Sequence, residues 1–164
     1  MTAVAPELAI YLNDHLAGST AGTRLADRVA GALAGTPSEI EARELAEQIH
    51  EDADALRRII DALGVHPQTF KRVLAAVSET ASRIKLGAAG GGNAHLSHVL
   101  QLESLTLGVT GKHRLWLVLR QAAGPRIATD DVDELVRRAE QQLGTIERLR
   151  AAEAKAAFGV VPVA

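Results

Sequence analysis

The sequence predicts an all-α protein in which four long helices form a bundle and one extra helix lies in the crossover between the two helical pairs. Apolar residues recur with helical spacing along most of the chain, and Gly or Pro residues separate the segments. No segment alternates apolar and polar residues as a β-strand would. The 164 residues are therefore expected to form a single helical-bundle domain, 1–157, followed by a short apolar tail, 158–164.

The first two helices are expected over residues 6–33 and 37–63, joined by a short turn that makes them a tight hairpin. Thr36 can cap the second helix, and Pro37 suits its first position, where a missing N–H leaves no hydrogen bond unmade. Glu39 completes a capping box, because its carboxylate can accept from the backbone N–H of the cap. These residues predict that the second helix begins at Pro37.

The extra helix is expected over residues 67–86 and is followed by a glycine-rich connector, 87–93. A long helix then spans residues 95–122, and the two glycines within 108–111 are candidates for a break in it. The last helix is expected over residues 130–157, since acidic residues gather in its first turn. The order of these elements makes two long helical pairs joined by a long crossover.

The apolar face of the first helix includes three small residues, Gly18, Ser19 and Gly22. The ordinary interpretation is that they allow a neighbouring helix to approach closely. The alternative is that they leave room for an apolar ligand between helices.

The helix at 95–122 carries apolar residues on every side. Such a helix is either central in a fold or shared with another subunit, and we expect a homodimer through it. The tail, 158–164, has two interpretations. It docks onto the protein's own bundle or a dimer partner, or a protein partner binds it in extended form because Pro162 prevents a helix.

Three polar residues from three different helices are predicted to face the interior: His15, Asp52 and Glu103. An imidazole and two carboxylates can hold one divalent cation, with water in the remaining positions. The alternative is a buried hydrogen-bonded network, with Gln48 at its margin, that fixes how the helices align. Lys112 is interpreted as a pair for Glu103 or as part of a solvated helix end.

The layout of two helical pairs and a long crossover resembles the ferritin-like superfamily. The segments 11–18 and 102–112, with Leu115-Trp116 after them, also resemble a family of small bacterial helical proteins that has no assigned activity. The ferritin-like resemblance implies an iron or manganese site with redox or storage activity, in which Glu103 matches an inward-facing ligand. Glu47 and His50 match the spacing of its Glu-x-x-His motif, but they lie on the charged face of their helix.

Composition excludes several classes of function. The chain has 18 Lys+Arg against 20 Asp+Glu, which argues against a general binder of nucleic acids or membrane surfaces. Cysteine is absent, so disulfides, thiolate metal sites and cysteine nucleophiles are excluded. The chain shows no secretory signal and no spanning segment, so a cytoplasmic protein is expected.

Catalytic motifs are not found. The string at 108–113 lacks the first Gly and the Ser or Thr of a phosphate-binding loop, and nothing assembles a Ser/His/Asp triad. His95 and His98 are interpreted as helix-start residues, because no Cys or acidic partner is near them in the sequence. We therefore expect a non-catalytic binding or assembly protein, with the metal-binding bundle as the alternative; no cofactor is identified.

Overall fold

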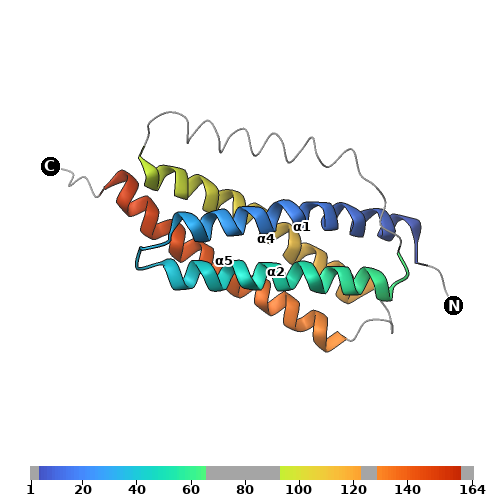
Figure 1. Ribbon diagram of the computed structural model, residues 1–164. Coiled ribbons are helices and arrows are strands. Elements are labelled where there is room, and N and C mark those ends of the chain that lie inside the picture. The colour runs from blue at the N-terminus through green and yellow to red at the C-terminus, as the bar shows by residue number, and fades with distance from the viewer. Residues whose placement is uncertain (1–3, 66–92, 123–128, 160–164) are drawn as a thin grey trace.

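The computed structural model describes residues 4–65, 93–122 and 129–159, and these ranges hold four long helices and no strand (Figure 1). The helices are α1 (Pro6–Ala32), α2 (Glu39–Ala62), α4 (Ala94–Ala122) and α5 (Thr129–Phe158). The all-α prediction is confirmed. The extra helix predicted over 67–86 lies outside the described residues, and so does the tail beyond residue 159.

The four helices form a bundle in which each packs against two neighbours. α1 packs on α2 and on α4, and α5 packs on α4 and on α2. α2 ends at one end of the bundle and α4 begins at the other, so these two helices run in the same direction (Figure 1). Each pair of packed neighbours is therefore antiparallel, and the pairs α1–α2 and α4–α5 are the two predicted helical pairs.

The turn between α1 and α2 differs from the predicted capping box. Gly35 has a φ of 75°, a left-handed conformation that suits glycine, and its N–H donates to Glu39 Oε2 at 2.8 Å. Thr36 Oγ1 donates to the Leu33 carbonyl at 2.6 Å and accepts from the Ser38 N–H at 3.2 Å. The helix consequently begins at Glu39 rather than at Pro37, because Thr36 closes the preceding turn instead of capping the next helix.

α4 is continuous through residues 108–111, so the break considered there is not observed. Val109, between the two glycines, and Leu115, four residues after the second, are almost fully buried. Burial of these side chains offsets the roughly 1 kcal/mol by which each glycine disfavours a helix.

α4 has both a buried and an exposed face. Leu102, Leu105 and Trp116 are buried, whereas Leu107 is 74% exposed. A helix at the centre of the fold would have no exposed face, so this explanation for the apolar residues around α4 is wrong.

No helix in the described part of the chain is long and apolar enough to cross a membrane.

Candidate functional site

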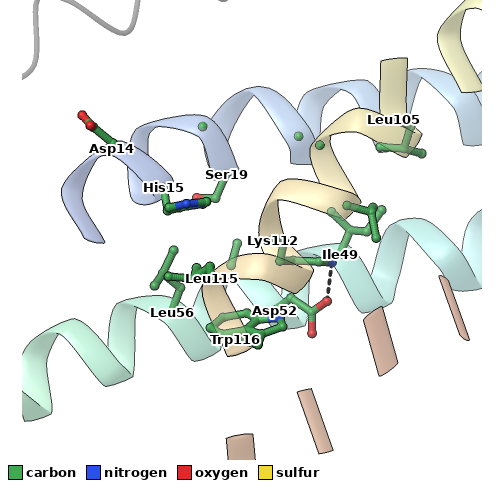
Figure 2. A pocket seen from close by; sticks show the side chains of 15 residues that line it. Asp14, His15, Ser19, Ile49, Asp52, Leu56, Leu105, Lys112, Leu115 and Trp116 are labelled. Atoms are coloured by element: carbon green, nitrogen blue, oxygen red, sulfur yellow. Dashed lines mark hydrogen bonds and ion pairs between the residues drawn. The ribbon is translucent and has the colours of Figure 1, made fainter. Parts of the chain in front are cut away.

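A pocket of about 290 Å³ lies between α1, α2 and α4 (Figure 2). Most of its lining residues are apolar or glycine, and five polar residues also line it. The lining residues are Asp14, His15, Gly18, Ser19 and Gly22 from α1, Ile49, Asp52, Ala53 and Leu56 from α2, and Leu105, Gly108, Val109, Lys112, Leu115 and Trp116 from α4.

The glycines of the lining do not bring helices into close contact. A Cβ atom added at Gly18, Gly22 or Gly108 would meet no heavy atom within 4 Å. The expectation of tight packing at Gly18 and Gly22 is therefore wrong. Their missing side chains leave space at the wall of the pocket, as the alternative interpretation held.

One side of the pocket is made by a buried ionic network around Asp52, whose side chain is fully buried. Lys112 Nζ donates to Asp52 Oδ2 at 2.5 Å and to Gln142 Oε1 at 2.6 Å. Gln142 Nε2 in turn donates to Asp52 Oδ2 at 3.0 Å, and Arg138 Nη2 lies 2.6 Å from Asp52 Oδ1. Three helices, α2, α4 and α5, are joined by these contacts.

The charges of this network balance. Asp52 faces two cations, and the second of them, Arg138, also donates to Glu51 Oε2 at 2.8 Å at the surface. Burial lowers the pKa of Lys112, the Asp52 carboxylate raises it, and the charge of Arg138 lowers it again. A carboxylate moved out of water is tolerated only when paired in this way.

Two donors at the pocket lack acceptors within the described residues. Lys112 has three N–H groups, of which two donate to Asp52 and Gln142. The indole N–H of Trp116 is buried and donates to no described residue. Buried donors of this kind are rare in folded proteins unless water or a ligand accepts from them.

His15 and Ser19 of α1 lie on the pocket side of the helix, whereas Asp14 points away (Figure 2). Burial lowers the pKa of His15, and the charge of Asp14 opposes that shift. Its ring lies edge-on to Tyr11, with ring centroids 4.5 Å apart. A histidine in this position is held toward its neutral form.

The predicted group of His15, Asp52 and Glu103 is only partly brought together. The first two line the same pocket, but Glu103 is exposed on the outside of α4, within electrostatic range of Arg150 on α5. The expectation that Glu103 faces the interior is wrong, because the core face of α4 is set by its neighbour Leu102. Metal binding by these three residues stays a prediction.

The residues that pair with Asp52 were missed. The sequence predicts Lys112 as a pair for Glu103 or as part of a solvated helix end, yet it lies four residues before the buried Trp116 and thus on the same helix face. Gln142 belongs to an alternating four- and three-residue repeat of buried positions on α5. These positions are Leu135, Ala139, Gln142, Ile146, Leu149 and Glu153. That spacing is the signal by which Gln142 and Glu153 could have been found.

Comparison with known proteins adds no constraint on the site. No protein-family model, curated protein or solved structure matches this chain. Function is therefore argued from the pocket and its side chains.

Proposed function

We propose that this protein is a non-catalytic binding protein that holds a small, mostly apolar molecule in the pocket between α1, α2 and α4. The observation that carries the proposal is the pocket itself, of about 290 Å³, bordered by the Lys112–Asp52 pair. Pockets for small molecules are typically concave and apolar, with a few polar groups that orient the occupant.

The charges and donors at the pocket indicate the chemistry of the occupant. Because Asp52 and Glu51 balance Lys112 and Arg138, the site favours a neutral molecule over an ion. The remaining N–H of Lys112 and the indole N–H of Trp116 call for an oxygen acceptor. At roughly 30 Å³ for each heavy atom, the volume suits a molecule of about ten such atoms.

The same network argues against the metal-binding alternative. Asp52 already contacts two cations, so a divalent ion beside it would meet repulsion from Lys112 and Arg138.

A ferritin-like topology stays our proposal for the fold, supported by the two antiparallel helical pairs and by the shared direction of α2 and α4 (Figure 1).

The proposal is tested with 2-nonanone, which has an apolar chain and one carbonyl acceptor, and with nonane, which lacks the acceptor. Trp116 is the single tryptophan of the chain and lines the pocket, so its fluorescence reports occupancy directly. We expect the ketone to change Trp116 emission and raise the thermal midpoint, because a ligand that binds only the folded state stabilises it. The alkane should bind more weakly, since it leaves both donors without an acceptor.

A matched pair of variants locates the binding. Gly22→Leu places a side chain at the pocket wall, and Gly31→Leu places the same side chain at an exposed position of the same helix with no atom nearby. Binding should be lost in the first variant and retained in the second. A wild-type chain that responds to neither compound contradicts the proposal, and so does equal binding by Gly22→Leu.

A further inference from the structure

A second cluster of chemically capable side chains lies at the end of the bundle where α4 begins and α5 ends (Figure 1). His95 Nδ1 lies 2.7 Å from Glu153 Oε2, and His98 Nδ1 lies 2.8 Å from the same oxygen. One ligand atom from each of the three residues lies within 4.8 Å of the other two. Glu153 of α5 thus meets two histidines of α4 that lie 55 or more residues earlier in the chain.

Local structure holds these side chains in place. Asn93 Oδ1 accepts from the His95 N–H at 3.0 Å, which caps the start of α4. Asn93 Nδ2 donates to the Ala157 carbonyl at 3.2 Å and ties this cap to the last turn of α5. His95 and His98, three residues apart, share one helix face, and Glu153 continues the buried repeat of α5 toward them.

We propose that His95, His98 and Glu153 bind one divalent transition-metal ion. Two imidazole nitrogens and one carboxylate oxygen are a ligand set that zinc and ferrous iron accept, with the remaining positions left for water or another small ligand. On binding, each neutral ring carries its proton on Nε2, so that Nδ1 presents its lone pair to the ion. The hydrogen-bonded contacts to Glu153 Oε2 are replaced by bonds to the metal.

The charge at this cluster distinguishes it from the network around Asp52. Asp52 is paired with a lysine and an arginine, whereas the ion pairs of Glu153 within the described residues involve only His95 and His98. The carboxylate group is nearly buried, with 9% of the side chain exposed. A nearly buried carboxylate that meets no lysine or arginine among the described residues favours an added cation.

A buried side-chain oxygen without a described donor belongs to a residue close to His98. A ligating histidine commonly donates its other ring N–H to an oxygen. Gln101 Oε1 is buried and accepts from no described residue, and His98 and Gln101 line the same small crevice between α1 and α4. The site is separate from the ligand pocket, since His98 precedes the nearest pocket residue of α4, Leu105, by about 10 Å of helix.

The experiment uses the full, untagged chain freed of metal by a chelator and titrated with zinc chloride in a calorimeter. We expect one equivalent to bind, and His95→Ala, His98→Ala and Glu153→Gln each to weaken binding at least tenfold. His113→Ala is the control, because this histidine also belongs to α4 but faces Glu140 at 3.3 Å, outside the cluster. Its zinc affinity should equal that of the wild type.

Visible absorption of bound cobalt(II) gives a second readout, because a histidine cluster with a purely structural role would not produce it. Bound cobalt should show visible absorption of a low-coordinate nitrogen and oxygen site, and one equivalent of zinc should abolish it. His95 is partly exposed, with 45% of its side chain accessible, so His95→Ala is the variant expected to fold normally. Failure of the wild type to bind zinc overturns the proposal, as does binding that survives all three substitutions.

Discussion

Asp52 illustrates how a single buried charge depends on its partners. Its carboxylate contacts Lys112, Arg138 and Gln142, and removal of the acid would leave a lysine without its counter-charge in an apolar site. We expect Asp52→Ala to lower the free energy of unfolding by about 3–5 kcal/mol, as measured by urea denaturation.

The neighbouring Glu51 is the matched control for Asp52. It also contacts Arg138, at 2.8 Å, but its side chain is 64% exposed, so water screens the pair. Glu51→Ala should lower the free energy of unfolding by no more than about 1 kcal/mol. If the two variants lost equal free energy of unfolding, burial of the Asp52 network would contribute nothing to stability.

His15 predicts a dependence of stability on pH. Its pKa in the folded protein is lowered by burial, with Asp14 opposing, whereas the unfolded chain keeps the ordinary value near 6.5. Between these two pKa values the unfolded chain binds more protons, so the free energy of unfolding falls as the pH decreases through this window. Below the folded pKa this contribution levels off.

The measurement compares wild type with His15→Gln, which keeps a polar side chain but does not titrate. The difference in unfolding free energy between the two proteins should change as the pH falls below about 6.5, the pKa of the unfolded chain. Parallel stability curves over that range would contradict the pKa shift.

At the scale of the element, the turn between α1 and α2 depends on one glycine. Gly35 has a φ of 75°, where a side chain is strained, whereas Gly31 lies within α1 with open space around it. We expect Gly35→Ala to destabilise the protein by about 1–2 kcal/mol. Gly31→Ala should instead stabilise it by about 0.5–1 kcal/mol, because alanine favours a helix. Thermal denaturation of both variants tests the prediction, and shifts of the same sign would refute it.

At the scale of the whole molecule, the exposed face of α4 bears on assembly. Leu96, Leu107 and Val118 recur every eleven residues, which is close to three helical turns, and all three are exposed. The dimer expected through this helix would bury them, since apolar side chains leave water favourably.

Light scattering tests this expectation, and a homodimer should give about twice the 17.3 kDa of the chain. Leu107→Glu should shift the mass to that of the monomer by placing a charge in the interface. Ile40→Glu changes another exposed apolar residue, on α2, and should leave the mass unchanged. A wild-type monomer at micromolar concentration would defeat the dimer.

The helices themselves were largely determined by the sequence. The predicted bounds of α1, α4 and α5 differ from the observed ones by a residue or so, as Pro6–Ala32 does from 6–33. Helical periodicity, glycines and prolines act within a few residues of chain, so they can be interpreted without knowledge of the fold. The start of α2 was misplaced because Thr36 had two local hydrogen-bonding options, and the observed one closes the turn.

The site was decided by tertiary structure. The sequence placed His15 and Asp52 inside, but it could not show that Lys112 from α4 and Arg138 from α5 reach the same carboxylate. It also could not show that Glu153 meets two histidines more than fifty residues earlier. Such contacts depend on the rotation and axial alignment of each helix, which the packing of all four helices sets together. Periodicity determines which face of a helix is buried, whereas only the assembled bundle determines what that face meets.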